Sequence, residues 1–340
     1  MKFCHLIGYT PMHAISYSRF GPPHEVLAPC EIPTPNPGPG EVLVRLHVSG
    51  VNPSDAKARA GARPGVTKPA YARIVPHSDG AGVIEAVGDG VPAARIGTRV
   101  WIWNGQWQRA LGTAAQYIAL PSAQAVALPE GVDFDIGACL GIPGLTAAHT
   151  VFGGGDVAGQ RLLVSGGAGA VGHNAVQLAS AAGAEVIATC SAPAMERVRA
   201  AGAAQVFDYS DPELAEKILD ATGGQGIDRA VEVEFGANVA LLPEVMAPNG
   251  TIATYGSFKD MTPQIPFGPY LFKALKIDIA LIYILPEAER QAAIAQLTKA
   301  IEAGTLRPAI HARFALEDCA TAHDTVMQPG RAGAVLLDID

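Results

Sequence analysis

The sequence predicts an α/β protein that combines a β-rich domain with a doubly wound parallel sheet. Short strands separated by glycine and proline occupy the first third of the chain, which is typical of barrels and sandwiches. After residue 133, apolar strands alternate with helices, which is typical of a parallel sheet. The length of 340 residues suits two domains. We predict one domain over residues 1–132, rejoined by 304–340, and a second over 133–303.

The first domain is expected to hold several short strands after a loop rich in proline and glycine. All three tryptophans, Trp101, Trp103 and Trp107, lie in or just after one of these strands. They fit either plain packing of a core and lid or the wall of a pocket for an aromatic molecule. The expected loop is 31–40, and the expected strands are 41–48, 80–87, 99–102 and 115–120.

The second domain is expected to begin with a helical stretch over 133–152 that Pro143 and Gly144 interrupt. Its final helix, over 286–303, places Ile294, Leu297 and Ile301 on one face. Further helices are expected at 170–182 and 212–222, and a last strand at 334–338 rejoins the first domain. The expected strands of the sheet are 162–164, 186–189, 205–207, 227–232, 251–255 and 277–284.

A glycine-rich turn lies between the strand at 162–164 and the helix that follows it. Its glycines occur at three-residue intervals, so the backbone can turn tightly and approach a ligand closely. The free N–H groups and the dipole of the helix favour an anion such as a pyrophosphate. The strand, turn, helix and strand order indicates a Rossmann dinucleotide site, although such a turn can also simply pack a helix on a sheet. The backbone residues expected to bind the cofactor are Gly166, Ala168, Gly169, Ala170, Val171 and Gly172.

The residues after the second strand indicate which dinucleotide is bound. An NAD site usually carries an acid about 20 residues past the glycines, but residues 189–195 contain none. Thr189 and Ser191 offer hydroxyl groups there, and Arg197 and Arg199 follow in the next helix. These residues favour NADPH over NADH, unless the two arginines only form a solvated helix face.

Composition and charge exclude several other classes of protein. The net charge of −8 without a basic run disfavours nucleic-acid binding. No apolar stretch is long enough to span a bilayer, and Met1–Pro11 does not resemble a signal peptide. The five cysteines are scattered and odd in number, so neither a disulfide framework nor a cysteine zinc knot is expected. We therefore expect a cytoplasmic protein.

Four further motifs follow one another along the chain: Ser49–Asp55 (SGVNPSD), His77–Gly88 (HSDGAGVIEAVG), Gly97–Val100 (GTRV) and Gly141–Ala147 (GIPGLTA). In their order and near their spacing, the chain resembles the zeta-crystallin-like quinone oxidoreductases, a zinc-free branch of the medium-chain dehydrogenases/reductases. The resemblance starts at Met12 and implies that Met1–Pro11 is an extension or that Met12 is the natural start. It also implies that the first domain is GroES-like and that hydride passes from NADPH to a quinone or an α,β-unsaturated carbonyl.

The chain also resembles the zinc alcohol dehydrogenases but lacks their metal ligands. The ligand positions of that family hold Asn52, Ser78 and Ile142. Zinc needs nitrogen, sulfur or carboxylate donors, so no metal is expected there. His77 and Asp79 flank the ligand position that Ser78 occupies, so they can hold a metal only if the ligands stand one residue away from the family's position. A surface or hydrogen-bonded pair is the alternative.

The resemblance also implies roles for individual side chains. Asn52 is expected to lie by the nicotinamide and to hydrogen-bond the acceptor, with a turn residue before Pro53 as the alternative. Asp55 is expected either to orient groups of the site or to cap the following helix. His149 replaces a tyrosine of many relatives and is expected to be a core histidine. The remaining expected cofactor contacts are Thr146, Tyr209, Tyr255, Gly256, Ser257 and Arg331.

Two other functions and one assembly remain open from the sequence. A zinc-dependent alcohol dehydrogenase with atypical ligands is one, and a non-catalytic NADPH-binding protein of the crystallin or RNA-binding type is the other. The apolar strand at 277–285 is expected at the edge of the sheet. Because exposed edge strands tend to pair, a homodimer through this strand is expected.

Overall fold

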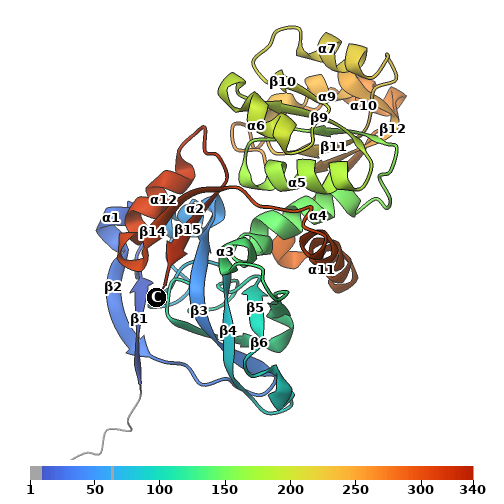
Figure 1. Cartoon of the computed structure of the whole chain (residues 1–340). Coiled ribbons are helices and arrows are strands. Elements are labelled where there is room, and N and C mark those ends of the chain that lie inside the picture. Colours follow the sequence, from blue (N-terminus) through green and yellow to red (C-terminus); the bar gives the residue numbers. More distant parts are fainter. Residues whose placement is uncertain (1–9, 63–64, 340) are drawn as a thin grey trace, which may run out of the picture. The chain divides into compact units, whose positions relative to one another are not determined.

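The computed structural model describes residues 10–62 and 65–339, which fold into two compact units (Figure 1). Residues 1–9, most of the predicted extension Met1–Pro11, lie outside the described part. Up to Gly141 the chain belongs to the first unit, together with Ala312–Gln328 and the residues from Val335 onwards. The second unit comprises Ile142–His311 and Pro329–Ala334. The predicted fold class, a Rossmann-like parallel sheet with a β-rich domain, is confirmed.

The first unit is built on a seven-stranded sheet whose strand order is β14-β15-β3-β4-β5-β7, with β6 paired to β3. A two-stranded antiparallel sheet, β1 with β2, accompanies it. The four strands predicted here correspond to β3, β4, β5 and β6. The bounds are β1 (Pro11–Ser16), β2 (Ala28–Pro33), β3 (Glu41–Val51), β4 (Asp79–Val87), β5 (Arg99–Ile102), β6 (Tyr117–Pro121), β7 (Ala125–Ala127), β14 (Ile310–Ala315) and β15 (Ala334–Asp338).

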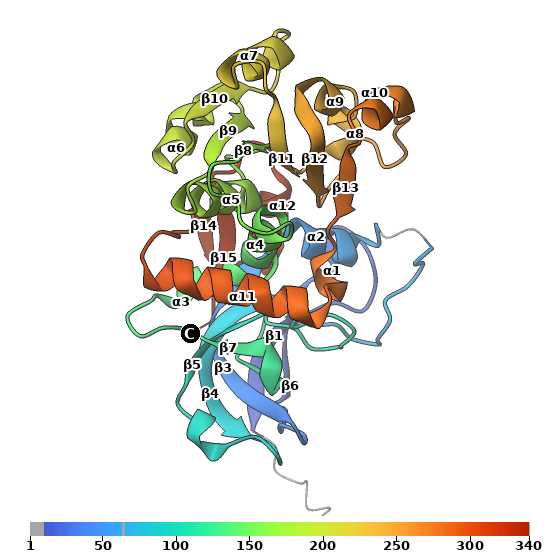
Figure 2. The same ribbon diagram turned by 90° about the vertical axis from the view of Figure 1, so that its right-hand side faces the viewer.

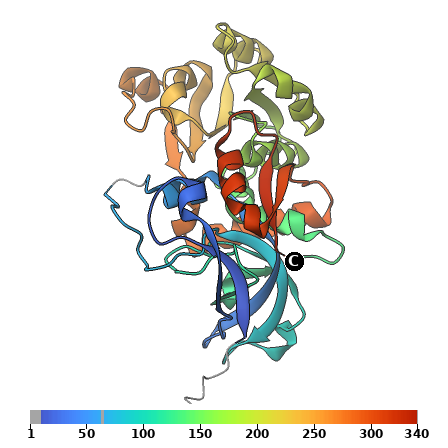
Figure 3. The same cartoon turned by 90° about the vertical axis from the view of Figure 1, so that its left-hand side faces the viewer.

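The core of this unit is formed by the inward side chains of these strands. Trp101 on β5 is 1% exposed and Trp103 is 8% exposed, so both pack in the interior rather than line an open wall. Helix α12 (Cys319–Met327) packs on α2 (Pro53–Ala60) and β3, and Figure 3 shows this red helix beside the blue elements. Two short helices complete the unit, α1 (Pro23–Val26) and α3 (Phe134–Gly137).

The second unit contains a six-stranded parallel sheet in the order β10-β9-β8-β11-β12-β13. Leu163 on β8 lies opposite Ile187 on β9 and Ala230 on β11. The strand order reverses between β8 and β11, and ligands of such sheets bind at the carboxyl ends near this reversal. The bounds are β8 (Arg161–Val164), β9 (Glu185–Cys190), β10 (Gln205–Asp208), β11 (Ile227–Glu232), β12 (Met246–Thr254) and β13 (Lys276–Ile279).

Helices follow the strands of this sheet, and Figure 2 shows α4, α5 and α11 lying close together. On α11, Ile294, Leu297 and Ile301 are buried, as their spacing predicts. None of the helices in the described residues is long and apolar enough to cross a membrane. The bounds are α4 (Leu145–Phe152), α5 (Ala170–Ala181), α6 (Met195–Ala200), α7 (Leu214–Ala221), α8 (Phe235–Asn238), α9 (Leu241–Val245), α10 (Phe267–Phe272) and α11 (Glu287–Glu302).

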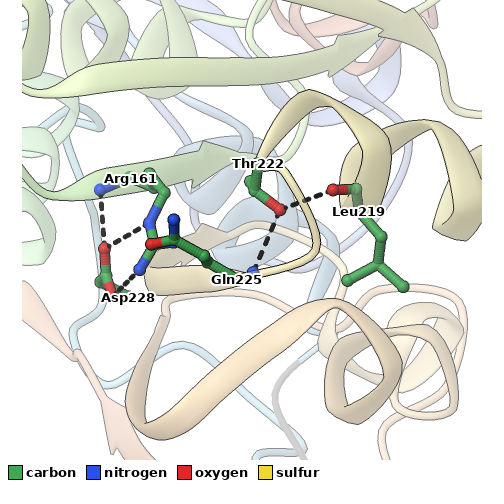
Figure 4. Close-up of polar contacts among 6 residues, drawn as sticks. Arg161, Leu219, Thr222, Gln225 and Asp228 are labelled. Carbon is green, nitrogen blue, oxygen red and sulfur yellow. Dashed lines mark hydrogen bonds and ion pairs between the residues drawn. The ribbon is translucent and has the colours of Figure 1, made fainter.

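An ion pair joins the starts of the two central strands, β8 and β11 (Figure 4). Arg161 donates through Nε to Asp228 Oδ2 at 3.0 Å and through Nη2 to Oδ1 at 2.8 Å. The backbone N–H of Arg161 donates to Oδ2 at 2.9 Å. Burial alone would raise the pKa of Asp228, but the Arg161 hydrogen bonds outweigh it and lower that pKa. The pair fixes the two strands at the end of the sheet opposite to the glycine turn.

The predicted strand at 277–284 is wrong in its second half. Strand β13 ends at Ile279, and Ile282–Ile284 form a 3₁₀ turn instead. The neighbouring strand β12 ends at Thr254, which pairs with Ile279, so the residues beyond have no ladder partner. Arg290 from α11 then donates to the carbonyl groups of Ile282 and Leu285, which stabilises the turn.

Candidate functional site

The glycine turn lies at the carboxyl end of β8 and begins helix α5. Gly166 has φ of +68°, a left-handed conformation that favours glycine. A Cβ on Gly172 would lie 2.2 Å from the carbonyl oxygen of Gly166, so the helix approaches the turn too closely for any side chain. Gly169 begins the helix and donates its N–H to that same oxygen at 3.0 Å. The strand, turn and helix therefore have the geometry that the glycine spacing predicts.

The start of α5 presents backbone N–H groups that no described side chain caps. The first hydrogen bond of the helix runs from His173 N–H to Gly169 C=O at 2.8 Å. Ala168, Ala170 and Val171 are half-buried at this end of the helix. Uncapped N–H groups at a helix start form a ready site for an anion.

Arg197 on α6 reaches this turn. Its Nη2 donates to the carbonyl oxygen of Ala168 at 3.1 Å. Its Nη1 is buried and has no hydrogen-bond partner among the described residues. His173 lies nearby, and the pKa of its imidazole is lowered by burial and then by the charge of Arg197. His173 was not among the predicted site residues; its place in the first turn of the helix was the available signal.

A carboxylate borders the loop after β9, contrary to the expectation that none is near. Asp208 ends β10 directly opposite Cys190, because the two strands pair in parallel. Its Oδ2 accepts a hydrogen bond from Ala192 N–H at 3.0 Å, and its Oδ1 accepts from Ser210. The Ser210 hydrogen bonds are the main cause of its lowered pKa. The window 189–195 contains no acid, but the fold brings one from the next strand.

Glu232 is a second carboxylate that the sequence analysis missed. It ends β11 beside the strand-order reversal and is fully buried. Ser165 Oγ donates to its Oε2 at 2.6 Å, and Asn238 Nδ2 donates to both carboxylate oxygens. Burial raises the pKa of this carboxyl group despite these donors. An acid that closes an apolar strand was the signal that could have revealed it.

The other predicted cofactor residues of the second unit lie in several places. Tyr209 follows β10 and is 59% exposed, whereas Tyr255, Gly256 and Ser257 follow β12 and are half-buried. Burial raises the pKa of the Tyr255 hydroxyl. Ser257 Oγ accepts from Gly236 N–H at 2.8 Å. Thr189 is buried at the end of β9, and Ser191 precedes a 3₁₀ turn.

Three further residues of this unit make local contacts. The hydroxyl of Thr146 donates to Ile142 C=O at 2.6 Å, one helical turn back. His149 is 6% exposed, and its Nδ1 lies 3.7 Å from a carboxylate oxygen of Glu289. Arg331 donates to Gly333 C=O at 3.1 Å. His149 is therefore a buried histidine, as expected.

Asn52 and Asp55 lie together in the first unit at the start of α2. Asn52 Nδ2 donates to Asp79 Oδ2 at 2.8 Å, and Asn52 N–H donates to Asp55 Oδ2 at 2.8 Å. All three side chains are buried. Asn52, not Asp55, is the N-cap residue, and Asp55 is at position N3 of the helix. The alternative in which Asp55 caps the helix therefore has the wrong cap residue. The Asp55 side chain takes part in the cap from position N3, where it accepts the N–H of Asn52.

The side chain of His77 makes its hydrogen bonds with Ser49 and with α12. Its Nε2 lies 2.9 Å from His323 Nε2 and 3.8 Å from Cys319 Sγ, both on α12. All three residues are fully buried. Burial lowers the pKa of the His323 imidazole to about 3 and also lowers that of His77. The four-residue spacing of Cys319 and His323 on one helix face was a signal that the sequence analysis did not use.

Two protein-family profiles match the chain. Residues 38–130 match the alcohol dehydrogenase GroES-like domain, and residues 170–299 match the zinc-binding dehydrogenase family. Together they define the class: an oxidoreductase of the medium-chain dehydrogenase/reductase type, with a GroES-like unit and a Rossmann-like unit.

Individual relatives define the family within this class. The quinone oxidoreductase of Rattus norvegicus is 31% identical over 97% of this chain and 98% of its own length, and that of Pseudomonas aeruginosa is 30% identical over 95% and 98%. A mycobacterial protein solved in complex with NADPH has a TM-score of 0.84 and 27% identity over 96% of this chain and all of its own. The chain therefore belongs to the zeta-crystallin-like quinone oxidoreductase family, as its motifs predict.

Proposed function

We propose that this protein is an NADPH-dependent reductase of quinones or other conjugated carbonyl acceptors, and that it works without a catalytic zinc ion. The observation that carries the proposal is the pairing of Asn52 with Asp79. At a position where the zinc relatives carry a ligand, this chain places an amide that donates 2.8 Å to a buried carboxylate. An amide nitrogen is not a zinc ligand, and Ser78 and Ile142 are no better.

The missing Lewis acid restricts the acceptor. A simple carbonyl needs its oxygen polarised as hydride arrives, which zinc does in the metal-dependent relatives. A quinone or an enone spreads the incoming charge by conjugation and needs less help. The bound nicotinamide supplies the hydride; the acceptor gains this hydride and one proton. The protein's task is to position the two reactants and exclude water.

The NADPH preference is supported by Arg197. Its buried Nη1 has no partner among the described residues, and its Nη2 is anchored on the glycine turn. A phosphate oxygen would satisfy this unpaired donor with a charge-assisted hydrogen bond. Asp208, whose carboxylate accepts hydrogen bonds from Ala192 and Ser210, carries a negative charge that opposes this attraction. The mycobacterial relative solved with NADPH supports the same cofactor.

The decisive test is steady-state oxidation of NADPH with naphthoquinone and an enone, with NADH in parallel. We expect turnover with NADPH and no loss of rate after incubation with EDTA or 1,10-phenanthroline. A chelator-sensitive rate would indicate a zinc-dependent alcohol dehydrogenase. Tight NADPH binding without turnover on any acceptor would indicate the non-catalytic alternative.

We also propose a homodimer through the edge of the parallel sheet. Strand β13 pairs only with β12 in the described chain and carries Ile279, which is 78% exposed. Phe272 and Ile284 flank it at 89% and 65% exposure. Exposed apolar side chains at an unpaired sheet edge are typical of an association site.

Sedimentation at micromolar concentration should therefore show a dimer. Ile279→Lys should shift the protein to a monomer, because it places a charge in the contact. Ile96→Lys is the matched control: Ile96 is 51% exposed and belongs to the first unit, whereas this edge belongs to the second. A monomeric unmodified protein would contradict the proposal.

The four described cysteines are free thiols, which supports the reducing, cytoplasmic setting inferred from the sequence.

A further inference from the structure

We propose that His77, Cys319 and His323 form a binding site for a single copper(I) ion. These residues are not the positions at which the zinc relatives carry ligands, and the proposed reductase activity does not use them. The sequence supplies one ligand from the loop before β4 and two from α12, so the metal would join two elements of the first unit. The proposal does not depend on the proposed function.

The three side chains lie close to the spacing of a three-coordinate site. Their ligand atoms all lie within 4.8 Å of one another. In a trigonal site with metal–nitrogen and metal–sulfur bonds of about 2.0 and about 2.3 Å, nitrogen atoms would lie about 3.5 Å apart and nitrogen and sulfur about 3.7 Å apart. The Nε2–Nε2 distance is 2.9 Å and the His77 Nε2–Sγ distance is 3.8 Å. A separation of the two rings by about half an ångström would admit the ion.

A chain of hydrogen bonds on the far side of the His77 ring leaves a lone pair on its Nε2, the atom that faces His323 and Cys319. Thr113 Oγ1 donates to Asp79 C=O at 2.6 Å. The hydroxyl proton of Ser49 is then shared with Thr113 Oγ1 at 2.8 Å or the same carbonyl at 3.4 Å. Ser49 Oγ must therefore accept from His77 Nδ1–H, 3.1 Å away. His77 Nε2 is left unprotonated, and its ring is held as in metal sites with a hydrogen-bonded outer shell.

His323 would supply the second nitrogen ligand through its Nε2. Because His77 Nε2 is an acceptor, His323 Nε2 must donate to it, so His323 Nδ1 carries a lone pair. This Nδ1 is buried and has no partner in the described chain. His77 itself has φ of +77°, which is unfavourable for a residue with a Cβ. Metal uptake would move the proton of His323 from Nε2 to Nδ1 and release the thiol proton of Cys319. Copper keeps its oxidation state, and one proton leaves in total.

Charge and ligand type select copper(I) over a divalent ion. A thiolate with two imidazoles is a soft donor set, which copper(I) favours. Copper(I) and the thiolate together are neutral, so a fully buried site needs no further counter-charge. Zinc(II) would leave one uncompensated positive charge. The nearby ionic groups do not correct this, since Arg59 and Asp55, both facing Cys319, carry opposite charges.

The test is anaerobic titration of the reduced, full-length protein with copper(I) in competition with bicinchoninate. We expect one ion to be retained by the unmodified chain, with at least tenfold weaker binding in Cys319→Ser and in His323→Gln. Cys139→Ser is the matched control, because Cys139 is equally buried in the same unit but does not belong to this cluster. The reference chain and all variants should carry Cys4→Ser and Cys30→Ser, so that these two thiols do not compete in any of them.

X-ray absorption of the copper-loaded unmodified chain gives a readout that needs no variant. A first shell of two nitrogen atoms and one sulfur atom is expected. Three results would overturn the proposal: no copper retained, a first shell without sulfur, or a Cys319-dependent site that holds zinc(II) in preference to copper(I). Retention that Cys139→Ser abolishes and Cys319→Ser does not would also overturn it.

Discussion

Replacing Gly172 by alanine should weaken NADPH binding by about ten- to a hundredfold. The added Cβ would lie 2.2 Å from the carbonyl oxygen of Gly166, so α5 must move away from the turn. Displacements of this kind cost about 1–3 kcal/mol, and each 1.4 kcal/mol is about a tenfold change in affinity. The N–H groups at the helix start would then no longer point at the pyrophosphate. Fluorescence titration with NADPH measures the effect.

Gly169→Ala is the control for this experiment. Gly169 has a negative φ, and a Cβ there would meet its nearest atom at 3.5 Å, an ordinary contact. Its affinity for NADPH should stay within about twofold of the unmodified protein. Thermal unfolding of both variants separates lost binding from lost folding. Equal affinities of the two alanine variants would show that the close approach of helix and turn is not needed for binding.

Replacing Arg197 by glutamine should raise the Kd for NADPH by at least tenfold and leave that for NADH nearly unchanged. A charge-assisted hydrogen bond is worth about 1.5–3 kcal/mol, which corresponds to about ten- to a hundredfold in affinity. NADH has no 2′-phosphate, so it cannot make this charge-assisted hydrogen bond and has nothing comparable to lose. Parallel titrations with both dinucleotides measure the ratio of the two affinities.

Arg199→Gln provides the matched control for Arg197. Arg199 lies on the same helix but is exposed, so its removal should change neither affinity by more than about twofold. An equal loss for NADPH and NADH in Arg197→Gln would have a different meaning. It would show that Arg197 acts through its hydrogen bond to Ala168 C=O, by holding the turn, and that it does not contact the 2′-phosphate.

Most of the fold could be predicted from local patterns. The strands at 162–164, 186–189 and 227–232 correspond closely to β8, β9 and β11, because short runs of apolar and β-branched residues between turn signals admit few other structures. The strand at 277–284 was wrong beyond Ile279 because its length depends on where the neighbouring β12 ends. A residue that is apolar and β-branched gives no information about whether a ladder partner is present.

The candidate site was predictable where one segment forms it, and unpredictable where several segments meet. The sequence by itself determined the two-unit architecture, the glycine turn at the start of α5 and the absence of the family's zinc ligands. Local strand and helix patterns carry the first two, and the residue types at single positions carry the third. Only the tertiary structure decided that Asp208 reaches the loop after β9 and that His77 meets Cys319 and His323. These contacts join residues 16 to 246 positions apart, and strand pairing and helix packing, not local spacing, bring them together.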